Sequence, residues 1–285
     1  TDKGATLGRV LFYDKNLSSN NTISCSSCHQ QNLAFSDAAI ASQGVNGTTG
    51  RHSMRLINTR FAAESKFFWD ERAANLETQT TMPIKDHAEM GYSGANGDAA
   101  IATLLTKLSN IGYYKELFKF VYGTEEITEN KIQLALAQFI RSIQSFDSKY
   151  DAGRALVAND NANFPNFTAQ ENTGKNLFNT PPIFDATGNR TSGGLGCAGC
   201  HKAPEFDIDP NTRNNGIIGT IGSNVIDITG AGDVVMSSFV YYYLKTNNLE
   251  QSTKFSNYCG QLKVKNLGTY IVTPYDVITY ERTLN

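Results

Sequence analysis

Two copies of one pentapeptide carry the most specific chemistry in this chain. The first is Cys25-Ser-Ser-Cys28-His29, near the start, and the second is Cys197-Ala-Gly-Cys200-His201, about two thirds along. This pattern is typical of c-type haem attachment, in which two thiols bond to the haem and the adjacent histidine ligates the iron. A redox disulfide or half of a zinc site would not require that histidine. We therefore expect two covalently bound haems, with His29 and His201 as proximal iron ligands.

Helices are expected to lead into both motifs. Residues Thr6 to Phe12 resemble residues Thr173 to Phe178, and each segment precedes a haem motif. Such a repeat indicates two related haem domains, which we place at residues 1–155 and 156–285. The Thr-Ala-Gln-Glu sequence at 168–171 is a capping-box pattern and predicts where the second of these helices begins.

The segment between the motifs indicates further helices. Thr128 is a candidate N-cap for a helix with one apolar face, which is more often core than part of a cofactor site. Helices are also expected over 99–108, following Asp98, and over 113–121. Loops are expected at 44–50 and 159–166. The fold class is therefore mainly α, with few or no strands. The apolar face of the helix that follows Thr128 comprises Ile132, Leu136, Phe139, Ile140 and Ile143.

The composition narrows the range of partners. The net charge is -2 over 285 residues, so there is no basic field for nucleic acid, and no apolar run approaches the roughly 20 residues that span a bilayer. No signal peptide is visible at Thr1, and c-type haem is attached outside the cytoplasm, so we expect the mature form of an exported, periplasmic protein. Four of the five cysteines lie in the haem motifs, which leaves Cys259 as a buried apolar residue.

Several further motifs resemble those of one family in their order and spacing. Together with the two haem motifs, they are similar to the bacterial di-haem cytochrome c peroxidases, a family that includes the MauG-like enzymes. The resemblance covers roughly residues 5–210 and fades beyond them. The motifs are Leu7-Gly8-x-x-Leu11-Phe12-x-Asp14, Phe68-Trp69-Asp70-Glu71-Arg72, Pro83-Ile84 and Glu89-Met90-Gly91.

The resemblance implies a reaction and the residues that carry it. The enzyme would reduce H2O2 to water at the first haem, with electrons that enter at the second haem from a mono-haem cytochrome c or a cupredoxin. Glu89 matches the family's catalytic carboxylate. Trp69, the only tryptophan in the chain, matches the residue between the two haems. Without the resemblance, Glu89 would read as a surface carboxylate and Trp69 as ordinary core packing.

The histidines outside the haem motifs depart from the family pattern. Many relatives close the peroxidatic iron with a histidine in the loop after the first motif, yet residues 30–50 contain none. His52 is then either a displaced iron ligand or a structural residue, and an isolated histidine is more often structural. His52 also stands near the position of the family's calcium-binding asparagine, which places calcium binding in doubt. His87 is expected to join the hydrogen-bond network around Glu89.

The distal ligand of the second haem has no motif in this sequence. Met236 is the only methionine between residues 216 and 285, which makes it the candidate by elimination. A buried strand or helix is expected for Val240 to Leu244, and a tyrosine of that run is the alternative ligand, as in MauG-like enzymes. Two other functions stay open: MauG-like oxidation of a protein side chain, and electron transfer without catalysis. Relatives are often homodimers, although no stripe of residues here indicates an interface.

Overall fold

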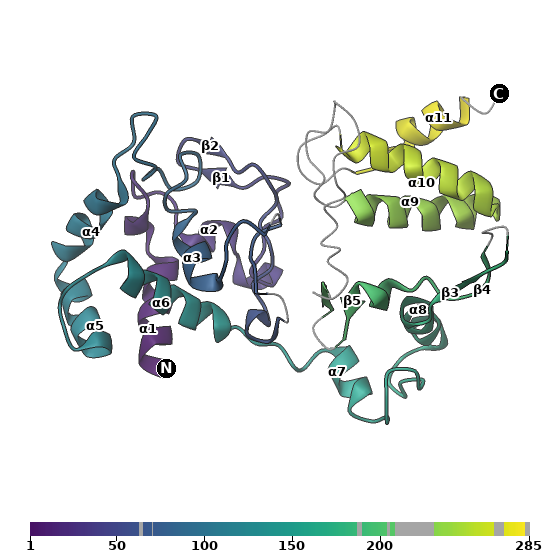
Figure 1. Cartoon of the computed structure of the whole chain (residues 1–285), viewed down its shortest axis with the longest axis horizontal. Coiled ribbons are helices and arrows are strands. Elements are labelled where there is room, and N and C mark those ends of the chain that lie inside the picture. Colours follow the sequence, from purple (N-terminus) through teal and green to yellow (C-terminus); the bar gives the residue numbers. More distant parts are fainter. Residues whose placement is uncertain are drawn as a thin grey trace.

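A computed structural model describes residues 1–62, 65–69, 71–186, 190–203, 206–208, 231–264 and 271–282. Figure 1 shows a mainly helical chain in which α1 to α6 gather in one group and α7 to α11 in another. The helices are α1 (Asp2–Tyr13), α2 (Cys25–Cys28), α3 (Leu76–Thr81), α4 (Ile101–Ser109), α5 (Gly112–Tyr122), α6 (Glu129–Arg141), α7 (Lys149–Arg154), α8 (Ala169–Asn179), α9 (Ala231–Thr246), α10 (Leu249–Val264) and α11 (Pro274–Arg282).

The strands in the described residues are short, as the sequence predicts for a mainly α fold. They form three antiparallel pairs, β1 with β2, β3 with β4, and β5 with β6. The first pair is a hairpin over residues 43–48, so most of it falls in the stretch 44–50, where a plain loop was expected. None of the described helices is both long enough and apolar enough to cross a membrane. The strands are β1 (Gln43–Gly44), β2 (Gly47–Thr48), β3 (Pro182–Phe184), β4 (Arg190–Gly193), β5 (His201–Lys202) and β6 (Asp207–Ile208).

The first group of elements is built on the packing of α1 against α6. Leu7 and Leu11 lie one helical turn apart on α1 and are fully buried, as is Leu136 on α6. Burial of each such side chain contributes about 1.5–3 kcal/mol. Gly8 lets the two helices approach, since a Cβ there would lie 1.9 Å from the carbonyl oxygen of Ala135. The same core extends to the residues around the first haem motif.

The helices expected between the two motifs are confirmed, with small shifts at their ends. Thr128 caps α6, and its hydroxyl accepts a hydrogen bond from the N–H of Lys131. The capping box of Thr168 and Glu171 begins α8. The apolar face predicted for α6 and the residues just after it is buried in the core, as expected. Two of its members, Leu136 and Ile140, also line the cavity beside the first haem motif, so this face serves both the core and the cavity wall.

A second hydrophobic core involves α9, α10 and α11. Cys259 is fully buried in it, as expected, and burial raises the pKa of its thiol to about 11. The run 240–244 is helical, and only Tyr242 in it is fully buried. The expectation of a buried run was therefore wrong, because consecutive residues of a helix face different directions. The buried members of this core are Val234, Tyr242, Phe255, Cys259, Val277 and Tyr280.

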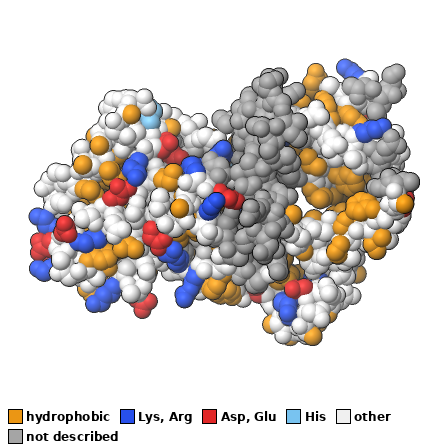
Figure 2. All heavy atoms as spheres, viewed as in Figure 1, with side chains coloured by type: hydrophobic (Ala, Val, Ile, Leu, Met, Phe, Trp, Pro, Cys, Tyr) orange, Lys and Arg blue, Asp and Glu red, His pale blue; other side chains and the backbone are white. Residues whose placement is uncertain are grey.

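The two groups of elements differ on the face of the molecule that Figure 2 shows. Figure 2 shows Lys and Arg interspersed with Asp and Glu over the first group, whereas hydrophobic side chains gather over the second. Exposed apolar residues of the second group include Phe184 on β3 and Tyr241 and Leu244 on α9.

Candidate active site

The first haem motif forms a single helical turn, α2, which places its three attachment groups together. The N–H of Ser24 donates to the hydroxyl of Ser27 at 3.0 Å and fixes the start of the turn. Cys25 and Cys28 stand one turn apart and so lie on the same face. The two thiols can therefore reach one macrocycle.

The imidazole that follows the turn has its tautomer set by the backbone. Nδ1 of His29 lies 2.9 Å from the carbonyl oxygen of Phe35. A carbonyl only accepts hydrogen bonds, so Nδ1 carries the proton, and Nε2 is the nitrogen that can ligate iron. Burial lowers the pKa of His29, which favours the neutral imidazole that a metal requires.

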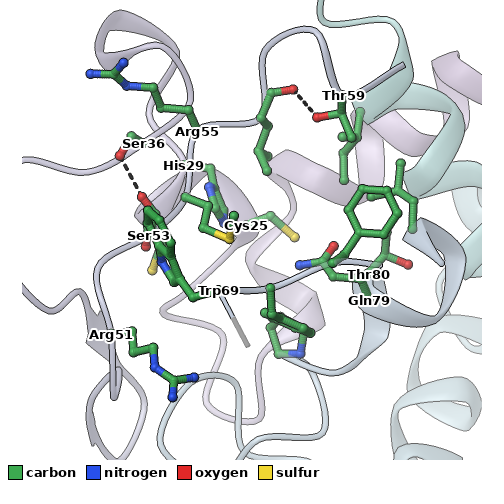
Figure 3. Close-up of a pocket in the computed structure, with 18 of the residues that line it drawn as sticks. Cys25, His29, Ser36, Arg51, Ser53, Arg55, Thr59, Trp69, Gln79 and Thr80 are labelled. Carbon is green, nitrogen blue, oxygen red and sulfur yellow. Dashed lines mark hydrogen bonds between the residues drawn. The ribbon is translucent and has the colours of Figure 1, made fainter. Parts of the chain in front are cut away.

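A cavity of about 1170 Å³ opens beside this turn, and Figure 3 shows Cys25, His29 and Trp69 around it. Glu89 lines the same cavity from a segment distant in sequence. The volume is above the range of most small-molecule pockets and leaves room for a macrocycle with its side chains. Apolar burial raises the pKa of the Cys25 thiol to about 12. Two thiols and an imidazole in one large cavity fit a covalently held haem.

Trp69 stands on a tight, strained turn in the wall of the cavity. The N–H of Glu71 donates to the carbonyl of Phe68 at 3.1 Å and closes the turn. Phe68 and Glu71 have backbone φ angles of 72° and 54°. Residues other than glycine rarely adopt such positive φ angles, and those that do are often found at functional sites. The indole Nε1 donates to the carbonyl oxygen of His52 at 3.0 Å, which fixes the ring.

His52 has both ring nitrogens engaged within the protein. Nδ1 lies 2.8 Å from the carbonyl oxygen of Ala39, and Nε2 lies 3.1 Å from the hydroxyl of Ser36. The Ser36 hydroxyl donates its proton to the carbonyl of Ser53 at 2.7 Å, as Figure 3 shows. This geometry favours the structural alternative for His52 over that of an iron ligand.

The environment of Glu89 differs from that of an ordinary surface carboxylate. Its side chain is partly buried in the cavity wall. Burial, followed by the negative charge of Asp86, raises the pKa of Glu89 to about 7, although the positive charge of Arg72 opposes this. A carboxyl with a pKa near neutrality can both accept and release a proton at neutral pH.

The side chain of His87 pairs with Asp98. Nδ1 of His87 lies 2.9 Å from Oδ2 of Asp98, and the hydroxyl of Ser93 donates to the same oxygen at 2.6 Å. Asp98 is therefore used in this cluster and does not cap α4, which begins at Ile101 and not at Ala99. The expected contribution of His87 to the network around Glu89 stays a prediction.

The second haem motif begins with a 3-10 turn over Cys197–Gly199, after which the exposed His201 starts β5. Residues 204, 205 and 209–230 lie outside the described residues. Met236 lies on α9 with 37% of its surface exposed. No cluster of three or more His, Cys, Asp or Glu side chains within the described part of the chain could hold a metal ion.

Three residues near Glu89 were not predicted from the sequence to contribute to this site. Asp86 accepts hydrogen bonds from the N–H groups of Ala88 and Glu89, and Arg72 acts on Glu89 through its charge. Gly44 packs directly against the Ala88 carbonyl. The aspartate three residues before Glu89 is a local signal that could have been found. The glycine contact spans two distant segments and has no local signal.

Residues 2–159 match the family described as di-haem cytochrome c peroxidase, which covers more than half of the chain. The chain belongs to this family.

The relatives include both peroxidases and MauG proteins. The cytochrome c551 peroxidase of Nitrosomonas europaea is 30% identical over 201 residues, which are 70% of this chain and 52% of that protein. The methylamine utilization protein MauG of Methylophilus methylotrophus is 31% identical over 148 residues, 52% of this chain and 42% of that one. The chain therefore spans about half the length of these curated relatives. A solved MauG-like protein associated with microbial copper homeostasis has a TM-score of 0.56 and 27% identity, and the match covers 81% of this chain and 61% of that one.

A second family match falls on the later part of the chain. Residues 191–275 match the pfkB family of carbohydrate kinases. This stretch begins within the resemblance to di-haem peroxidases and extends past residue 210, where that resemblance fades, and it includes both the second haem motif and Met236. The match covers less than half of the chain, and much of it lies outside the described residues, so we assign no kinase function from it.

Proposed function

We propose that this protein reduces hydrogen peroxide to water with electrons from a small redox protein. The observation that carries the proposal is that Glu89, with its pKa raised to about 7, lines the same cavity as the two thiols and the imidazole of the first haem motif. One turnover consumes one H2O2, two electrons and two protons and releases two waters. The donor would be a mono-haem cytochrome c or a cupredoxin, and electrons would enter near His201.

Glu89 would manage the protons of the reaction. A haem bound through Cys25, Cys28 and His29 supplies an iron that binds peroxide and exchanges electrons with it. The Glu89 carboxylate would take the proton from the near oxygen of peroxide and deliver it to the far oxygen, which leaves as water. The apolar part of the cavity wall would keep bulk water away and strengthen the electrostatic contacts of Glu89.

The proposal is tested by steady-state oxidation of a reduced cytochrome by H2O2. The fully oxidised protein is compared with the same protein after reduction by one electron. Activity in both states would support a peroxidase whose first haem needs no activation, which is our expectation because His52 is engaged elsewhere. Activity only after reduction would support a gated peroxidase. Absence of activity in both states, with two haems present, would refute the proposal.

The rate of peroxide reduction is expected to depend on the ionisation of Glu89. The proton-accepting form is the carboxylate, so activity should fall as the pH drops through about 7, where Glu89 becomes protonated. Below that pH the rate should decrease by about tenfold per unit. A pH profile of kcat/KM measures this. A profile that stays flat down to pH values near the ordinary glutamate range would contradict the assignment.

Trp69 is proposed to relay electrons between the two haems. Replacing it by phenylalanine keeps an aromatic ring but removes the indole and its hydrogen bond to the His52 carbonyl. We expect the rate of interhaem electron transfer to fall at least about tenfold, which corresponds to about 1.4 kcal/mol in the barrier. Stopped-flow spectroscopy after reduction of one haem measures this rate. If the rate were unchanged, Trp69 would be a packing residue and not an electron relay.

Met236 is our proposal for the distal ligand of the second haem. A thioether ligand favours ferrous iron, so Met236→Ala should lower the reduction potential of that haem, within the roughly 0.8 V range that axial ligands control. A spectroelectrochemical titration measures the change. Val235→Ala, one residue away on α9, is the control. Identical potentials for the Met236 variant and the wild type would show that Met236 is not the ligand and would favour a tyrosine of α9 instead.

MauG-like oxidation of a protein side chain is the second candidate function. The observation that favours it is the similarity to MauG proteins and to a MauG-like solved structure. Such an enzyme would accumulate oxidising equivalents in the presence of peroxide without consuming a reduced cytochrome. The activity measurement above therefore separates the two candidate functions.

We further propose a periplasmic location and haem domains at residues 1–155 and 156–285.

A further inference from the structure

The short segment that carries Glu89 is held by two other parts of the chain. The N–H of Val45, at the tip of the β1–β2 hairpin, donates to the carbonyl of Glu89 at 3.0 Å. The next N–H of the hairpin donates to the carbonyl of Ala88 at 3.2 Å. The N–H of Ser19, which follows the first helical region, donates to the carbonyl of Met90 at 2.9 Å. The backbone on both sides of Glu89 is thus fixed from outside its own segment.

Gly44 allows the hairpin to come this close. It is buried, and a Cβ at this position would lie 2.0 Å from the carbonyl oxygen of Ala88 and 2.9 Å from the Cα of Glu89. The obstacle would be backbone and not a flexible side chain, so any larger residue must displace the Glu89 segment or the hairpin. No other residue type fits this contact without movement.

Asp86 fixes the same segment from within. Its Oδ1 accepts from the N–H of Ala88 at 2.8 Å and from the N–H of Glu89 at 3.0 Å. Hydrogen bonds of this type to a charged acceptor are stronger than those between neutral groups. The N–H and the carbonyl of Glu89 are therefore both held, the first by Asp86 and the second by Val45.

We infer that Gly44 and Asp86 are positioning residues, which hold the Glu89 carboxylate at its place in the haem cavity. The inference rests on the proposed role of Glu89 in peroxide reduction. Proton transfer requires the carboxylate within hydrogen-bond reach of the reacting oxygen. A displacement of about 1 Å at a reacting group costs up to about a hundredfold in rate. Two residues that touch no substrate are thereby needed for turnover.

Gly44→Ala tests the first half of the inference in the protein with both haems attached. We expect kcat/KM for peroxide to fall by about tenfold to a hundredfold, with unchanged haem content. A second readout follows the carboxyl itself: infrared spectroscopy detects the protonated Glu89 band, identified by its loss in Glu89→Gln. Its titration midpoint and frequency should change in Gly44→Ala, because the carboxyl moves relative to its neighbours.

Gly112→Ala is the matched control for this substitution. Gly112 is exposed at the start of α5, and a Cβ there would meet nothing within 4 Å. Gly112→Ala makes the same chemical change as Gly44→Ala without a steric consequence, so its kcat/KM for peroxide and its infrared titration should match those of the wild type. Gly44→Ala protein that behaves like this control in both readouts would overturn the role of Gly44.

Asp86 is tested with two substitutions, which also cover the case that Gly44→Ala does not fold. Asp86→Asn keeps an oxygen that can accept both hydrogen bonds, whereas Asp86→Ala removes it. We expect Asp86→Asn to retain the rate within about threefold and Asp86→Ala to lose at least about tenfold. Equal rates in the two variants would show that Asp86 does not position Glu89.

The infrared titration also separates the hydrogen bonds of Asp86 from its charge. The groups that act on Glu89 are Asp86, Arg72 and the sulfurs of Cys25 and Cys28, and the sulfurs no longer titrate once they are thioethers. Loss of the Asp86 charge should lower the Glu89 midpoint in both variants, but only Asp86→Ala should also change the band frequency. If Glu89→Gln were fully active, the proposed role of Glu89 in proton transfer would fail, while the infrared readout would still decide whether Gly44 and Asp86 position its carboxyl.

Discussion

Replacing Glu89 by glutamine is expected to lower peroxide turnover by roughly 10²–10⁴-fold, the range that a positioned acid–base group contributes. Glutamine has nearly the same shape, so the packing of the cavity and the hydrogen bonds of the Glu89 backbone should persist. It has no ionisable carboxyl and cannot carry a proton from one peroxide oxygen to the other. Steady-state kinetics with H2O2 and a reduced cytochrome measure the loss.

The readouts that should not change make the Glu89 experiment decisive. Haem content, the absorption spectrum of both haems and their reduction potentials should stay close to those of the wild type. Glu71→Gln is a suitable control, because Glu71 belongs to the neighbouring turn and its side chain stands 4.0 Å from Lys66. Full activity in Glu89→Gln would remove Glu89 from the mechanism. A plain electron carrier would also show no sensitivity to this substitution.

Replacing His29 by alanine is expected to lower the rate of peroxide turnover by at least about a hundredfold. Residues that merely support a metal ligand typically cost 10–100-fold when they are lost, and His29 is the ligand itself in our proposal. Cys25 and Cys28 should still hold the haem covalently. The spectrum of the first haem should change while its absorbance remains. Added imidazole should enter the space left by the side chain and restore part of the activity.

The corresponding change in the second motif should have a different signature. His201→Ala should interrupt electron entry from the donor, so steady-state turnover falls. A single reaction of peroxide with protein reduced beforehand should still proceed at the first haem. If both variants lost the single reaction equally, the division of roles between the two haems would be wrong.

Local signals account for what could be predicted from this sequence. The haem motifs are contiguous, and the cap at Thr128 and the apolar face of α6 depend only on residues within a few positions of one another. Helical periodicity and capping are short-range effects, so one sequence is enough to read them. The buried position of Cys259 followed from its chemistry alone.

The geometry around Glu89 and Trp69 could not be predicted, because it depends on contacts between distant segments. Gly44 meets Ala88, and the carbonyl of His52 meets the indole of Trp69. The backbone oxygen of His52 makes the second contact, and any residue type would offer that oxygen. The sequence therefore drew attention to the imidazole of His52, whereas the main chain at this position holds Trp69.

The single tryptophan gives the molecule a built-in optical reporter. Trp69 is the only indole in the chain, and it stands in the wall of the cavity that fits the first haem. All tryptophan fluorescence of the protein therefore originates beside that cavity. A porphyrin absorbs at the wavelengths where indole emits, so a filled cavity should be nearly dark and an empty one bright. Emission intensity would thus report haem loading during maturation without a label.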